Sequence, residues 1–278
     1  MRVPALSLAF VLCAISLAAT ATGAQEPGDG EAKEAPRTSG DHIVNCMRPL
    51  GHHAYQREFT CPIGGGKFKS LVLGTHSTYG RHLDWKPVSY MDLAAPVPVC
   101  PSNGFVMFKD EFSDEELSRY KTVIEGEKYS RIFRENHPSY YLLARLRELA
   151  GDKNENRWFQ MVVATWEADA CGSEKYAFYA DEAIEAAKAR LKSVEKFGDE
   201  YWVLNIIIPN LYRRTGRFDE AQAWLDTLDL EGLESLEEGG EYYKLAFTLL
   251  SEAVSENNDK RIPIEKPEDE KPKDQEDE

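Results

Sequence analysis

Two short phrases, each with Cys-Pro at the end of a β-prone run and glycine soon after, most restrict how this chain can fold. They are Thr-Cys-Pro-Ile-Gly-Gly-Gly at 60–66 and Val-Cys-Pro-Ser-Asn-Gly-Phe at 99–105. A zinc knuckle has this form, because two thiolates hold the metal from a tight turn. A complete knuckle would carry a second cysteine in each phrase, where this chain has Gly64 and Asn103. The phrases therefore predict a frame that brings Cys61 and Cys100 together, with half of the zinc ligands missing.

The first 24 residues have the parts of a secretory signal. Arg2 precedes an apolar stretch, Leu6 to Ala19, and small residues follow up to Ala24. The stretch is shorter than the roughly 20 apolar residues that span a bilayer. We therefore expect a signal peptide at 1–24 and a protein exported to the periplasm or secreted, with no stable membrane insertion after cleavage. An uncleaved anchor and lipidation at Cys13 are the alternatives.

Export changes what the cysteines are expected to do, since disulfides persist in oxidising compartments. A bond that closes the loop from Cys61 to Cys100 would stabilise a weakly cored module by about 3–4 kcal/mol on the chain-entropy estimate. We expect this disulfide in place of the zinc site, and Cys46 with Cys171 as a second pair on parity alone. Other pairings and free thiols remain open.

A retained zinc ion is the alternative to the disulfide. Its candidate ligands are Cys61, Cys100, Cys46, His52 and His53. Adjacent histidines on an extended segment point to opposite faces, and the chain has no His-Glu-x-x-His spacing. The motif Arg81-His82-Leu83-Asp84 is the other histidine candidate, and hydrogen-bonded or surface histidines are favoured for both. We therefore expect no cofactor, with zinc as the alternative.

Changes in composition divide the rest of the chain. The β-prone runs are 57–60, 68–73 and 97–99. We expect a flexible leader at 25–42, a β-rich module at 43–112, a helical repeat domain at 113–256 and an acidic, disordered tail at 257–278. The β-prone runs are too short to bury a core alone, so the module needs a cross-link, a metal or a neighbour.

The helical part begins at a capping box, Ser113-Asp114-Glu115-Glu116. His137-Pro138 opens a second helix, since proline suits the first position. Further helices are expected at 157–170, 174–197, 200–214, 218–228 and 241–255, with glycines in the gaps. Short loops between amphipathic helices predict antiparallel neighbours stacked in series.

Residues 210–225 resemble a tetratricopeptide repeat. The matching aromatic, turn and packing positions are Tyr212, Gly216, Phe218, Ala221, Leu225 and Leu228. Asn205 and Pro209 depart from the pattern, and Pro209 should kink its helix or begin it anew. The expected fold is mainly α, a tetratricopeptide-like helical repeat array with a small β-rich, zinc-ribbon-like N-terminal module.

The two Cys-Pro phrases, Pro138–Ala144 and Leu211–Gly216 are together similar in order and spacing to a bacterial family labelled domain of unknown function 2225. That family pairs two Cys-Pro-x-Cys knuckles with tetratricopeptide-like helices. The resemblance covers about residues 57–230. It implies that Cys61 and Cys100 occupy zinc-ligand positions, and it implies no activity.

The net charge and the absence of known catalytic motifs from the sequence exclude several classes of function. A net charge of −15 repels nucleic acid and anionic lipid. The glycines at 64–66 lack the spacing of a phosphate loop, and no Gly-x-Ser-x-Gly elbow occurs. We favour an exported, non-enzymatic scaffold that binds a protein or peptide partner on the inner face of the array. Its candidate contacts are Trp166, Tyr201, Trp202 and Asn205. The alternative is a metal-dependent enzyme or metal-binding protein that uses the N-terminal cysteines and histidines.

Overall fold

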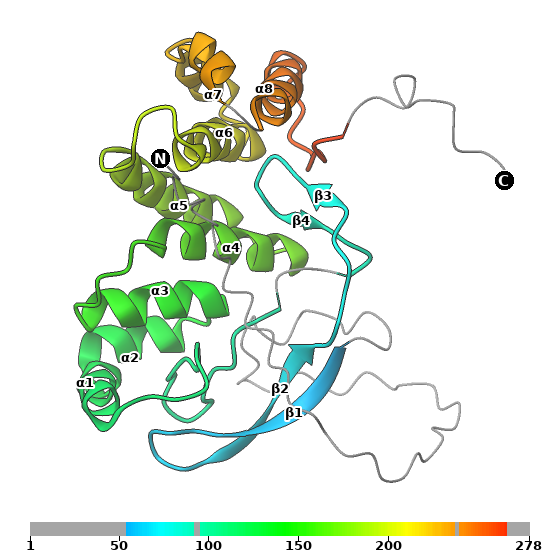
Figure 1. Cartoon of the computed structure of the whole chain (residues 1–278). Coiled ribbons are helices and arrows are strands. Elements are labelled where there is room, and N and C mark those ends of the chain that lie inside the picture. Colours follow the sequence, from blue (N-terminus) through cyan, green and yellow to red (C-terminus); the bar gives the residue numbers. More distant parts are fainter. Residues whose placement is uncertain (1–53, 92–94, 237–238, 266–278) are drawn as a thin grey trace, which may run out of the picture.

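The computed structural model describes residues 54–91, 95–236 and 239–265 (Figure 1). Within this part, strands come first. β1 (Ala54–Thr60) and β2 (Lys67–Leu73) form an antiparallel ribbon in which Ala54 faces Leu73 and Thr60 faces Lys67. β3 (Gly80–Arg81) and β4 (Pro87–Val88) form a second, much shorter hairpin. The β-prone runs at 57–60 and 68–73 therefore lie within β1 and β2, and the run at 97–99 contributes an isolated bridge between Val99 and Val106.

Helices make up the rest, as the mainly α prediction requires. They are α1 (Asp114–Glu125), α2 (Glu127–Arg134), α3 (Ser139–Leu149), α4 (Arg157–Ala170), α5 (Tyr176–Leu191), α6 (Asp199–Arg214), α7 (Phe218–Leu225), the 3-10 helix Leu230–Ser235 and α8 (Gly240–Ser255). From α1 to α7 each helix packs against the next one, and α8 packs against both α6 and α7. The helices thus form a stack that rises from α1 to α8 (Figure 1).

Local chemistry sets several helix limits. The predicted capping box is present, because Glu116 N donates to Ser113 Oγ at 3.2 Å and Ser113 N donates to Glu116 Oε2 at 2.9 Å. After α6, Gly216 has a φ of 76° and makes the turn into α7. Pro209 lies inside α6, which continues to Arg214 instead of starting anew. The buried isoleucines at 206–208, which precede the proline, and the buried Leu211, which follows it, hold this helix in the core although Pro209 has no backbone N–H to donate.

The buried residues form two clusters. The first core joins the two Cys-Pro turns to α1, α2 and α3, with Phe105, Tyr120, Tyr129 and Leu142 at its centre. It crosses the expected boundary between residues 112 and 113, so the β-rich module and the first helices bury one shared surface. The second core lies between α3 and α8, and it includes Leu83 and Trp85 from the loop between β3 and β4.

Residues 258–264 are here called the C-terminal strap, and its residues 262–264 pair with residues 81–83, at and just after the end of β3. Leu83 N donates to Ile262 O at 2.9 Å, and Ile264 N donates to Arg81 O at 2.7 Å. Ile264 is only 4% exposed. This differs from the expected disordered tail at 257–278, because two isoleucines near its start have a hydrophobic site to fill. The strap and the β3–β4 hairpin lie beside α4, α6 and α8 (Figure 1).

None of the helices in the described ranges is both long and apolar enough to cross a membrane.

Candidate functional site

The two Cys-Pro turns have the same backbone geometry. Cys61 N donates to Gly66 O at 2.9 Å and Gly65 N donates to Cys61 O at 3.0 Å; Cys100 N donates to Phe105 O and Gly104 N to Cys100 O, both at 2.8 Å. Gly65 and Gly104 take equivalent positions with φ of 69° and 76°, which glycine adopts at no steric cost. The sequence phrases therefore fold into a matched pair of turns that face each other.

A disulfide joins these turns at Cys61 and Cys100, as predicted, with a Cα–Cα distance of 5.8 Å. Both sulfurs are buried, and sulfurs bonded to each other have no thiolate to offer zinc. Asn103, at the position of a missing ligand, donates from Nδ2 to Ile63 O at 2.7 Å and so ties one turn to the other. Cys171 is disulfide-bonded as well. Cys46, its expected partner, lies outside the described residues.

The remaining predicted metal ligands, His52 and His53, also lie outside the described residues. Within the described ranges, no group of three or more His, Cys, Asp and Glu side chains is arranged to hold a metal ion. His82 lies in the hairpin loop, where Nδ1 is buried without a hydrogen-bond partner. Burial lowers the pKa of His82, partly offset by the nearby Asp84.

The four predicted binding residues do not share an open surface. Trp166, Trp202 and Asn205 are buried, and Tyr201 is half-buried. Trp202 Nε1 donates to Phe197 O at 3.2 Å, and Asn205 Oδ1 accepts from Trp224 Nε1 at 3.1 Å. Trp202 and Asn205 therefore make these contacts within the helical stack, whereas Trp166 Nε1 donates to Asp84 O in the loop between β3 and β4, at 3.3 Å.

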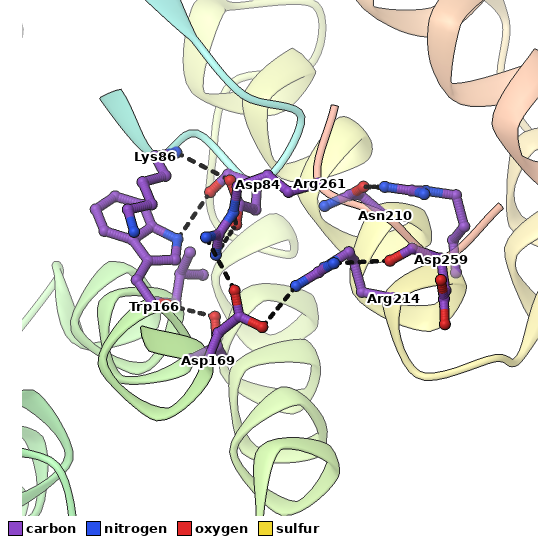
Figure 2. Close-up of polar contacts among 11 residues, drawn as sticks. Asp84, Lys86, Trp166, Asp169, Asn210, Arg214, Asp259 and Arg261 are labelled. Carbon is purple, nitrogen blue, oxygen red and sulfur yellow. Dashed lines mark hydrogen bonds and ion pairs between the residues drawn. The ribbon is translucent and has the colours of Figure 1, made fainter. Parts of the chain in front are cut away.

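That contact leads to a partly buried ion cluster between the hairpin, the helices and the strap (Figure 2). Asp84, 1% exposed, accepts from Arg261 Nε at 2.8 Å on its Oδ2. Asp169 of α4 pairs with Arg261 Nη1 at 2.9 Å and accepts from Arg214 Nη2 of α6 at 2.9 Å. We call Asp84, Asp169, Arg214 and Arg261 the Asp84 cluster; it joins four segments that are far apart in the sequence.

A second pair of contacts from α6 holds the backbone of the strap. Arg214 Nη1 donates to Asp259 O at 2.7 Å, and Arg213 Nη1 donates to Asn258 O. Arg213 is fully buried and also donates to Asn210 Oδ1 at 2.7 Å. Desolvation, with the nearby Arg214, lowers the pKa of Arg213 to about 10, so the guanidinium stays charged at neutral pH. The arginines of α6 therefore serve as donors to the strap.

The hairpin loop is shaped to carry Asp84 inward. Trp85 takes a left-handed φ of 66°, and its N–H donates to His82 O at 2.8 Å, closing a tight turn. The Trp85 ring stacks on Tyr243 of α8 with centroids 6.2 Å apart, and its edge meets Tyr242. These contacts anchor the loop on α8 while Asp84 and Trp166 anchor it on α4. The helices and the Asp84 cluster thus hold two segments of the chain itself, the hairpin loop and the strap. The charged groups of the cluster pair with one another.

A separate buried acid joins α3 to α4. Glu167 accepts from Ser139 Oγ at 2.5 Å and from Tyr140 N at 3.0 Å, and Ser139 Oγ accepts from Val97 N at 2.8 Å. Burial raises the pKa of Glu167 to about 7. The nearby His137 bonds to Tyr179 and Glu135, so these described groups do not pair a serine nucleophile with a histidine base.

Sequence reasoning missed the Asp84 cluster, whose two main members are 177 residues apart. No local spacing connects them. The available signal was the run Arg261-Ile262-Pro263-Ile264, in which two isoleucines alternate with proline in an otherwise polar end of the chain. That alternation is typical of a short strand with one buried face.

Neither a scan against protein-family models nor searches of the curated proteins and of the solved structures found a match for this chain.

Proposed function

We propose that this protein is an exported, non-enzymatic scaffold that binds a protein or peptide partner. The observation that carries the proposal is the way α4, α6 and α8 hold chain segments from elsewhere in the molecule. They bind the hairpin loop through Trp166 and Tyr243 and the strap through Arg214. A surface that already recognises a turn and an extended strand, by backbone and charged contacts, is suited to recognising such segments in a partner.

The proposed architecture is a degenerate tetratricopeptide-like array behind a degenerate zinc-ribbon module, as the family resemblance implies. We pair α4 with α5 and α6 with α7, and treat α8 as the first helix of a further pair. In such arrays the first helices line the binding surface. Consistent with this, the contacts to the hairpin and strap come from α4, α6 and α8. The matched turns at Cys61 and Cys100 support the ribbon-like module.

Two exposed tyrosines at the base of the same hairpin supply a contact surface for the partner. Tyr79 is 69% exposed and Tyr90 is 49% exposed. They flank the hairpin, since Tyr79 N donates to Val88 O at 2.9 Å. Tyrosine is enriched at protein interfaces because it supplies a large contact area with a polar end. The buried loop tip thus fixes the direction in which these rings are presented.

Export is part of the proposal and rests on the signal-like first 24 residues and on the Cys61–Cys100 disulfide. A buried disulfide is maintained in oxidising compartments and is rare in the cytosol. The same bond removes Cys61 and Cys100 from any zinc site in the oxidised protein.

Site-specific photocrosslinking in the cells that make the protein tests the proposal. A photoreactive side chain replaces Tyr79 in one variant and the exposed Lys121 of α1 in a matched control. The expected result is a discrete protein adduct from the Tyr79 position and none from the Lys121 position. The proposal is overturned if both positions give only the uncrosslinked chain.

A further inference from the structure

We propose that the outer edge of β3, with Asp84 and Asp169, forms a recognition slot for an extended, arginine-containing protein segment, which the C-terminal strap occupies in the isolated chain. The inference rests on the proposed binding function and names the chemistry of the partner. The segment carries an arginine and, three residues later, a buried aliphatic side chain, as Arg261 and Ile264 do in the strap.

The backbone of the strap is bound as an added strand. It accepts from Leu83 N through Ile262 O and donates from Ile264 N to Arg81 O. Main-chain hydrogen bonds of this kind recognise any extended segment, as in strand addition to a sheet edge. They supply affinity without selecting a sequence, so the choice of partner must come from side chains.

The arginine side chain provides this selectivity. Arg261 reaches Asp84 through Nε at 2.8 Å and Asp169 through Nη1 at 2.9 Å. A planar guanidinium can bridge two carboxylates from fixed positions, whereas a lysine ammonium is a single point charge. Without the guanidinium, the 1% exposed Asp84 would lose its ion-pair partner within the described residues. A buried carboxylate that has lost its ion-pair partner strongly favours the binding of another cation.

A short linker connects the strap to α8. Only Glu256 and Asn257 separate it from α8, and Asn257 takes a left-handed φ of 52°. Such a linkage keeps the strap near its slot at an effective concentration on the order of millimolar. A partner segment therefore enters when the strap is weakened or when the partner binds elsewhere on the scaffold as well.

The test uses the full-length protein and a fluorescent peptide of residues 258–265, blocked at both ends. The receptor variants are wild type, Arg261→Ala and the matched control Lys260→Ala, whose side chain is 84% exposed. We expect the peptide to bind Arg261→Ala and, at the same concentration, neither wild type nor Lys260→Ala. The same peptide with alanine in place of its arginine should bind Arg261→Ala about thirtyfold more weakly or worse.

Hydrogen exchange at the Leu83 amide gives an independent measurement. Its protection should fall in Arg261→Ala and return when the arginine peptide is added. The inference is overturned if protection in Arg261→Ala equals that of wild type, or if it falls and the peptide does not restore it. Crosslinking from the Tyr79 position, in a chain with an intact strap, tests the binding function independently. The two measurements therefore distinguish a failure of the recognition slot from a failure of the proposed function.

Discussion

Glu167 shows at the scale of one residue how a buried acid can fix two helices. Its two oxygens receive Ser139 Oγ–H and the Tyr140 N–H at the start of α3. A carboxylate at a helix N-terminus satisfies free backbone donors, yet complete burial disfavours its charge and raises its pKa to about 7. Neither effect was visible in the sequence, where Glu167 is one of many acids; only the fold shows that it is buried.

The raised pKa predicts that stability changes with pH at this residue. Because the folded state favours the protonated acid, its contribution is complete below the unfolded pKa of about 4.5 and is lost as pH rises through about 7. The loss should be about 3 kcal/mol. Urea unfolding from pH 4.5 to 7.5 measures it, and Glu167→Gln should flatten this part of the profile. An identical slope in wild type and variant would contradict the assignment.

Asn103 shows what residue-level reasoning reached and what it did not. The chain's departure from a four-cysteine site was readable from Gly64 and Asn103, and the disulfide followed from the pairing of the two phrases. That Asn103 would tie the turns together, by donating to Ile63 O, depends on the facing geometry of the folded turns. The exposure of the proposed binding residues could not be predicted from the sequence either. Trp202 and Asn205 lie at helical positions whose burial depends on the neighbouring helices.

At the scale of elements, the two Cys-Pro turns are equivalent in backbone but not in surroundings. A Cβ added at Gly104 would lie 2.6 Å from the ring of Phe133 in α2, whereas one added at Gly65 would meet nothing within 4 Å. Tyr129 Oη also donates to Gly104 O at 2.8 Å. The second turn is therefore docked on α2, and the first is open on that side.

This difference makes the turns a matched pair for mutagenesis. Gly65→Ala should cost about 1 kcal/mol, the price of a left-handed φ for alanine. Gly104→Ala should cost roughly 3 kcal/mol or more, because the methyl group also displaces Phe133. Chemical denaturation measures both losses. Equal costs at the two positions would show that docking on α2 does not constrain the turn.

Some elements followed from the sequence and others did not. α4 spans the predicted 157–170, and its apolar spacing between Gly151 and Gly172 is a strong local signal. α2 was missed, since it has only eight residues and follows α1 after the single residue Gly126. The strap was assigned to the acidic tail because its pairing with β3 is set by a distant segment. Elements defined by their own sequence were predictable; those defined by a partner segment were not.

The described residues form two cores, and the Cys61–Cys100 disulfide belongs to only one of them. Cys61 and Cys100 lie in the first core, with α1, α2 and α3. The paired substitution Cys61→Ala and Cys100→Ala should lower the free energy of unfolding by about 4 kcal/mol, for a separation of 39 residues. Hydrogen exchange should quicken around Tyr129 and Leu142 more than around Ile207 in α6. Uniform quickening would mean that the cores unfold as one unit.

Truncation separates the strap from the residues that follow it. A chain ending at residue 265 should keep the melting temperature of the full chain, since residues 266–278 carry no apolar side chain. A chain ending at 257 loses Arg261 and the buried Ile264, and its melting temperature should fall by roughly 5–10 °C. Thermal unfolding by circular dichroism compares the two. An equal fall in both chains would contradict the strap's structural role.

The pairing of the strap with β3 also sets an order of events during synthesis. The ribosome makes Asp84 long before Arg261. The ion pair between them can form only after another 177 residues have been synthesised. Until then the Leu83 amide and the Asp84 carboxylate lack the partners that the strap supplies. A chain interrupted before residue 261 would leave this hydrogen bond and this ion pair unformed. The hairpin therefore reaches its final packing only late in synthesis, after the strap has been made.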